Sequence, residues 1–186
     1  DFKNSIQVPI NINLKKRKML KKNIGSKILL LSNTTEIYCT RIQTGPIAGQ
    51  MLEDYQLWKV FTQELFPQIK ENLLFRPHPL DFWNLRKKYA IDFGEKYISN
   101  KKIFEEDIRR AKFIVDFSLQ TTFYQTMKTG IPIIILFHRK ILNMDPKLSK
   151  LLNLFIKNKI FFDNPYEASK HINEIWDNPL HWWNSK

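Results

Sequence analysis

The chain has 186 residues, a formal net charge of +12 and one cysteine, and 43% of its residues are hydrophobic. This composition excludes a disordered chain and is enough for one domain with its own core. The apolar runs are far shorter than the roughly 20 residues that a membrane-spanning helix needs. No signal peptide is expected, and the lone Cys39 excludes an internal disulfide and a multi-cysteine zinc site. We therefore expect a cytoplasmic location, either free or at the inner face of the membrane.

Six basic residues are concentrated in residues 14–22 (LKKRKMLKK). Basic clusters attract polyanions, which makes an anionic membrane or a nucleic acid one interpretation. A solvated face in a chain rich in Lys, Ile and Asn fits the same residues. Because the chain has no zinc-finger spacing, no RNP-type motif and no Arg-rich repeat, a nucleic-acid partner is not the expected one.

Apolar runs alternate with helical patterns from residue 27 onward. The first run, 27–32 (KILLLS), predicts a strand that is buried on both faces. A helix is expected over 53–66, where apolar residues recur at helical spacing and Pro67 follows. The next expected elements are a strand over 73–76, a helix opened by Asp81 and closed by Gly94, a charged helix over 105–111 and a strand over 112–116.

The same alternation continues to the end of the chain. The expected elements are a helix over 120–129 ended by Gly130, a strand over 131–137, a helix over 146–156, a strand over 159–162 and a helix over 165–176 capped by Asn164 or Asp163. Strands that alternate with helices predict an α/β fold, a Rossmann-like parallel sheet with helices on both faces. Residues 1–26 lack the pattern, so we expect a lead-in or linker followed by one domain over 27–186.

Polar residues follow three of the predicted strands. These segments are 32–35 (SNTT), 76–79 (RPHP) and 116–122 (DFSLQTT), the last of which leads into a helix. In an open α/β sheet, ligands bind outside the carboxyl ends of the strands, and a helix start with hydroxyl groups is suited to phosphate. Arg76 and His78 would contact the same anion. The sequence therefore predicts an anion site at this edge of the sheet.

Each of these residues also has an ordinary structural explanation. A histidine after a strand is commonly a hydrogen-bonding residue, and a Ser or Thr at a helix start is commonly a cap. The meeting of three segments at one edge favours ligand binding, with His138 as a minor candidate at the same edge. No pair of histidines has metal-ligand spacing, and no P-loop, GxSxG or GxGxxG motif occurs, so neither a metal nor another cofactor is expected.

Two stretches of the chain carry a family resemblance. RPHP and the later KFIVDFSLQTTFYQTMKTGIPII resemble the donor-binding half of GT-B glycosyltransferases, which include HP-motif sialyl-, Kdo- and CDP-glycerol-type transferases. The tail IFFDNPYEASKHINEIWDNPLHWWNS is similar to that of transferases of bacterial surface carbohydrate biosynthesis. The resemblance implies that His78 contacts the donor phosphate beside Arg76. It also implies that Thr121 and Thr122, with Ser118 nearby, hold the same phosphate.

The resemblance further implies what the domain does. It points to a glycosyltransferase-type domain, half of a GT-B fold, that binds a nucleotide-activated sugar for surface polysaccharide synthesis. Gln125 stands five positions before Gly130, where many GT-B enzymes have an acidic residue that binds the donor ribose. Glutamine is a weaker, neutral partner, and Gln120 replaces an expected serine. The general base is then expected on an N-terminal acceptor domain that this chain lacks.

Other readings of the sequence remain open. One is a phosphotransferase of the CDP-glycerol type that moves a polyol phosphate, and another is a non-catalytic basic module that binds an anionic membrane or nucleic acid. The Trp-rich tail, 177–186, is expected to pack back on the core because tryptophan has a large apolar area. An interface with another domain or with a membrane is the alternative for this tail.

Overall fold

The computed structural model describes residues 25–33, 48–118, 121–138 and 146–185. Its strands form one parallel sheet of five, in the order β2-β1-β3-β4-β5. They are β1 (Lys27–Leu31), β2 (Leu73–Arg76), β3 (Ala111–Asp116), β4 (Ile133–Leu136) and β5 (Phe161–Phe162). The predicted Rossmann-like α/β fold is confirmed.

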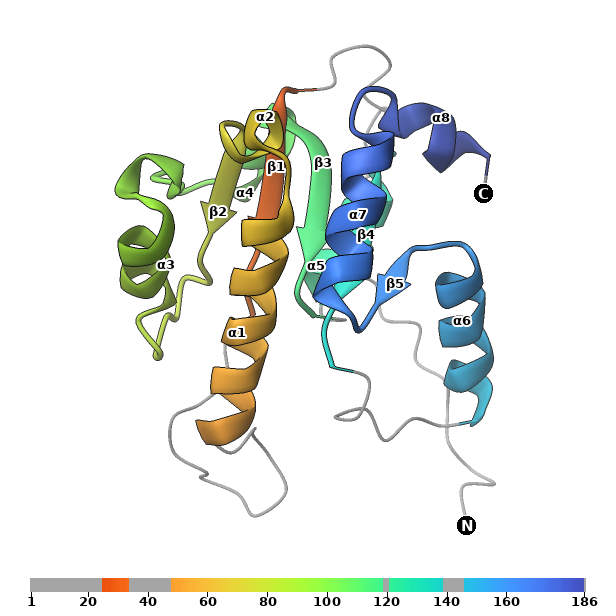
Figure 1. The fold of residues 1–186 in the computed structure, drawn as a ribbon, viewed down its shortest axis with the longest axis horizontal. Helices are drawn as coiled ribbons and strands as arrows, with labels where there is room; N and C mark the ends of the chain where they lie inside the picture. The colour runs from red at the N-terminus through yellow and green to blue at the C-terminus, as the bar shows by residue number, and fades with distance from the viewer. Residues whose placement is uncertain (1–24, 34–47, 119–120, 139–145, 186) are drawn as a thin grey trace.

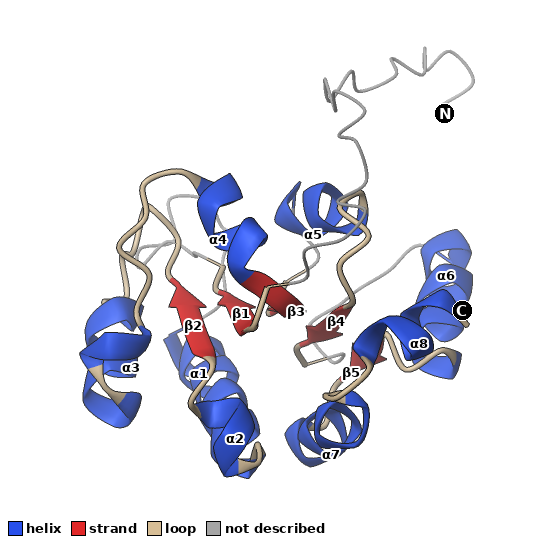
Figure 2. Cartoon of the chain, turned by 90° about the horizontal axis from the view of Figure 1, so that it is seen from above, coloured by secondary structure: helices blue, strands red, loops and turns tan. Residues whose placement is uncertain are grey.

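Helices cover both faces of this sheet (Figure 1 and Figure 2). They are α1 (Ala48–Glu64), α2 (Pro67–Lys70), α3 (Leu85–Phe93), the 3-10 helix η1 (Glu95–Tyr97), α4 (Phe104–Arg110), α5 (Thr121–Met127), α6 (Pro146–Lys157), α7 (Pro165–Ile175) and α8 (Pro179–Asn184). Helices α1 and α7 pack side by side on one face, and α4 and α5 lie on the other (Figure 2). Helix α3 flanks the β2 end of the sheet and α6 flanks the β5 end (Figure 1).

The central strands are apolar because helices exclude water from both of their faces. Leu29 and Leu30 of β1 are fully buried, as is Phe75 of β2. Aromatic stacking joins the layers, since the ring of Trp58 in α1 lies 4.6 Å from that of Phe117 just after β3. This packing holds the carboxyl ends of the strands in place.

Neither edge of the sheet is a long open strand. At the β2 edge, the N–H of Ser99 donates to the carbonyl of Phe75 at 2.8 Å, and Ile98 forms a parallel bridge with Phe75. This short segment covers the outer side of β2. At the opposite edge, β5 has only two residues, Phe161 and Phe162.

Most of the expected elements are found with small shifts in their bounds. Helix α1 begins five residues before the predicted start at Glu53, and the short helices α2 and α8 were not predicted. The predicted packing of the Trp-rich region on the core is confirmed for Trp182, which is buried against Phe113 at 6.0 Å. Gly130 has a φ of +73° after α5, as expected of a helix-ending glycine. The predictions for 1–24, for 34–35 and for Gln120 lie outside the described residues.

Candidate functional site

Arg76, the last residue of β2, directs its guanidinium toward α4. Its Nη1 donates to a carboxylate oxygen of Asp107 at 2.5 Å and to the carbonyl of Lys101 at 3.0 Å. Its Nη2 donates to the carbonyl of Lys102 at 3.2 Å, and the guanidinium lies 5.4 Å from the centre of the Phe104 ring. Only 13% of the Arg76 side chain is exposed. These contacts give Arg76 a structural role, and its contact with an anion stays a prediction.

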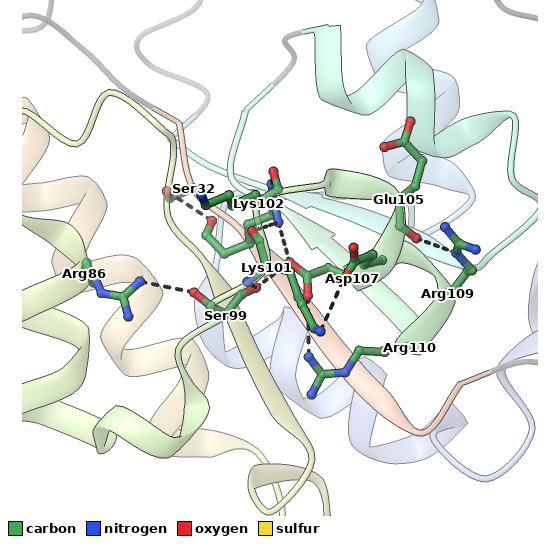
Figure 3. Close-up of polar contacts among 11 residues, drawn as sticks. Ser32, Arg86, Ser99, Lys101, Lys102, Glu105, Asp107, Arg109 and Arg110 are labelled. Carbon is green, nitrogen blue, oxygen red and sulfur yellow. Dashed lines mark hydrogen bonds and ion pairs between the residues drawn. The ribbon is translucent and has the colours of Figure 1, made fainter.

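Asp107 is the fully buried centre of this cluster. Besides Arg76, it accepts a hydrogen bond from Ser99 Oγ at 2.5 Å and forms an ion pair with Arg110 at 3.6 Å. Figure 3 shows Arg110 reaching Asp107, and Arg86 donating to the carbonyl of Ser99. A buried carboxylate is tolerated where charged and hydroxyl donors compensate for lost water. The cluster thus ties the end of β2 to α4 and to the segment that covers its edge.

His78 lies two residues beyond β2 in a turn held by hydrogen bonds. Its backbone N–H donates to Ser32 Oγ at 2.9 Å, and Ser32 Oγ donates to the carbonyl of Arg76 at 3.4 Å. Its imidazole Nδ1 accepts from the N–H of Leu80 at 3.1 Å. Because Nδ1 is an acceptor, the ring proton is on Nε2. No hydrogen bond to Nε2 is formed within the described part of the chain, so the fixed, half-buried ring has a donor left for a ligand.

Asp116 ends β3 as a buried acid, 1% exposed. Its Oδ1 accepts from the N–H of Ser118 at 2.9 Å and from Ser118 Oγ at 3.1 Å. Its Oδ2 is buried, with no hydrogen-bond partner among the described residues. Burial raises the pKa of Asp116 to about 7, although the two bonds from Ser118 act to lower it. Both donors of Ser118 are therefore directed at Asp116, and its contact with a phosphate stays a prediction.

The remaining predicted contact residues are on α5, which starts at the carboxyl end of β3. Thr121 is exposed, Thr122 is half-buried, and Gln125 is exposed one turn later. The buried Thr126 holds the helix backbone, donating to the carbonyls of Thr122 at 3.0 Å and Phe123 at 2.8 Å. Polar side chains of the helix are thus accessible at the same edge as His78. Their contacts with phosphate and ribose stay predictions.

The sheet register brings the candidate segments level with one another. Leu31 in β1 pairs with Arg76 on one side and with Asp116 on the other. Of the predicted residues, the structure joins Ser32 directly to His78. No hydrogen bond in the described residues joins His78 to Ser118 or to the threonines of α5. Two separate sets of polar residues therefore lie at this edge, one around His78 and Ser32 and the other around Asp116, Ser118 and the start of α5.

Asp54, on α1, is a buried acid that the sequence analysis did not select. It is 8% exposed, and its Oδ1 has no hydrogen-bond partner among the described residues. Burial raises the pKa of Asp54 to about 6, while the neighbouring charge of His138, just after β4, acts to lower it. Helical spacing could have revealed it, because Asp54 shares the apolar face of α1 with Met51 and Trp58.

Of the groups at this edge, the Nε2–H of His78 can donate to an anion. Side-chain oxygens of Asn33, Asp54 and Asp116 have no hydrogen-bond partner among the described residues, but they are buried and not open to a ligand in this structure. In the described ranges, no three His, Cys, Asp or Glu side chains gather in a way that could hold a metal ion. None of the helices described is long and apolar enough to cross a membrane.

Comparison with known proteins places the chain in a family. No curated protein matches the chain. The model of the LIC12162 family transferase matches residues 2–186, which include the whole sheet and every predicted site residue. The predicted transferase class agrees with this match, while the GT-B half and the surface carbohydrate remain predictions. The chain belongs to the LIC12162 family of transferases.

Proposed function

We propose that this chain is the donor-binding part of a glycosyltransferase that uses a nucleotide-activated sugar. One observation carries the proposal: the His78 ring is fixed by its own turn and keeps an Nε2–H donor at the carboxyl edge of a Rossmann-like sheet. A hydrogen bond from such a donor to a charged phosphate oxygen is among the stronger ones in proteins. Because the ring is already ordered, little conformational entropy is lost when the phosphate binds.

In this proposal, the polar residues of α5 serve the other parts of such a donor. Thr121 and Thr122 supply hydroxyl groups for the phosphate, and Gln125 supplies an amide for the ribose. Arg76 acts on the phosphate indirectly, since its contact with Asp107 holds the strand end that carries His78. A polyol-phosphate donor presents the same phosphate to His78, so product analysis separates that alternative from sugar transfer.

The test is calorimetry of the folded chain with CMP-, CDP-, UDP- and GDP-linked donors. We expect one nucleotide class to bind, and His78→Ala to weaken it by about 10-fold to 100-fold, the range for one hydrogen bond to a charged group. His181→Ala is the matched control, because His181 is exposed on α8 and far along the chain from the site. Absence of binding to every donor, or equal binding by His78→Ala, would refute the proposal.

A further inference from the structure

Helix α6 presents leucines and lysines together on its outer surface. Leu151 is 45% exposed and Leu154 is 54% exposed, although large apolar side chains usually turn inward. Lys150 and Lys157 are exposed on the same helix. At 100° per residue, Lys150, Leu154 and Lys157 fall within 60° of one another around the helix, with Leu151 beside Leu154. We call these four residues the α6 strip.

The inner face of the same helix is already used by the fold. Leu152 is 3% exposed, and Phe155 packs edge-on against Phe123 of α5 at 5.9 Å. These contacts hold α6 in place beside β5 without using the α6 strip. Within the described residues, about half of the surface of each strip leucine is left uncovered by this packing.

The charged side chains of α6 itself are all of one sign. The sequence of α6, PKLSKLLNLFIK, has three lysines and no acidic residue. Lys159 is exposed just beyond the helix end, where it lines a pocket with Asp163, Glu167 and Glu174. A helix that combines exposed leucines with lysines and lacks acids is suited to the interface of an anionic bilayer, where lysines meet lipid phosphates and leucines enter the acyl boundary.

The position of α6 leaves the candidate site accessible. The helix flanks β5 at one end of the sheet, and β2 lies at the other end (Figure 1). His78 follows two residues after the end of β2. The α6 strip and the turn that carries His78 are therefore near opposite ends of the sheet. Binding at both places at once is compatible with this arrangement.

We propose that the α6 strip docks this chain reversibly on an anionic phospholipid surface. Two leucines and two lysines give weak attachment, because one apolar anchor of this size does not hold a protein on a membrane permanently. The interaction does not depend on the transferase reaction. It uses neither His78 nor α5, so donor binding and membrane binding are tested separately.

The experiment is co-sedimentation of the whole chain with vesicles of phosphatidylcholine that contain about 30 mol% phosphatidylserine. The phosphatidylserine gives these vesicles a negative surface like that of an anionic membrane leaflet. Wild type is expected to bind these vesicles and to bind pure phosphatidylcholine far more weakly. Combined Leu151→Ser and Leu154→Ser should lower the partition coefficient about tenfold at unchanged net charge. Combined Lys150→Gln and Lys157→Gln should lower it about fivefold for each lysine.

Matched variants control for hydrophobicity and charge elsewhere. Ile91→Ser on α3 removes a side chain that is 74% exposed, and Lys87→Gln with Lys128→Gln removes two exposed charges. The serine control should leave binding unchanged, and the charge control should change it less than the α6 pair. Circular dichroism confirms that each variant is folded.

Three outcomes would overturn the proposal. The first is no binding of wild type to phosphatidylserine vesicles. The second is wild-type binding by both α6 variants, which would assign the membrane contact to another basic segment such as 14–22. The third is a wild-type dimer in sedimentation analysis that the leucine variant abolishes, which would make a second copy of the chain the occupant of the α6 strip.

Discussion

Replacing Arg76 by alanine separates its structural role from the anion contact suggested by its sequence. The guanidinium makes three hydrogen bonds, to Asp107 and to the carbonyls of Lys101 and Lys102, and its side chain is 13% exposed. The substitution leaves the fully buried Asp107 with Ser99 and with Arg110 at 3.6 Å. Asp107 therefore loses its nearest positive charge.

The expected loss of unfolding free energy is about 3–5 kcal/mol, the usual effect of removing one partner of a buried ion pair. For a chain of this size, the midpoint of thermal unfolding should fall by roughly 6–20 °C. Combined Arg76→Met and Asp107→Leu should be less destabilised than the sum of the two single changes, because the double variant leaves no unpaired buried charge.

Urea unfolding followed by circular dichroism measures this loss. Arg109→Ala is the control, since Arg109 is exposed and, among the described residues, its side chain donates to a carbonyl of its own helix, that of Glu105, at 3.3 Å. Its expected loss is below about 1 kcal/mol. If Arg76→Ala lowered the unfolding free energy no more than Arg109→Ala does, the structural assignment of Arg76 would be wrong.

Two further predictions concern β3 and the start of β1. Burial raises the pKa of Asp116 to about 7 from 3.8, so its protonated form stabilises the fold below pH 4 and this stability is lost as the pH rises through 7. In wild type, this group should lower the unfolding free energy by up to about 4 kcal/mol between pH 4 and pH 8, and Asp116→Asn should remove that part of the pH dependence. An unchanged pH dependence of the unfolding free energy would contradict this prediction. A Cβ on Gly25 would lie 1.9 Å from the carbonyl oxygen of Arg110, so Gly25→Ala should destabilise by about 1–3 kcal/mol. Gly49→Ala meets nothing within 4 Å and should be neutral or slightly stabilising; equal stability of the two variants would refute the clash.

The α/β architecture was predictable because the local patterns agree with the global fold. Each buried strand is a short apolar run, and the order of runs and helices fixes a parallel sheet. Asp81 was expected as the N-cap, but the helix begins at Leu85 with Asn84 at the cap position. The carboxylate oxygens of Asp81 still accept from the N–H groups of Leu85 and Arg86 at 2.8 Å. The early start of α1 was missed because Pro46 and the residues near it carry no regular apolar spacing.

The candidate site was only partly predictable, because sequence shows where a side chain starts and not where it points. The spacing of RPHP brought Arg76 and His78 to the same strand end, but the donors of Arg76 are used by an aspartate thirty-one residues away in the chain. Ser118 was selected as a phosphate contact, yet both its donors reach Asp116. Which partner each of these side chains bonds depends on its tertiary neighbours, which no local sequence pattern encodes.

The two edges of the sheet limit how copies of this chain can associate. An open strand edge is a template on which another strand can add, and long flat edges favour aggregation. Here the segment at Ile98 and Ser99 covers β2, and β5 offers only Phe161 and Phe162. Within the described residues, growth of the sheet from one molecule into the next is therefore disfavoured at both ends. Contacts between copies would have to form through helices and loops.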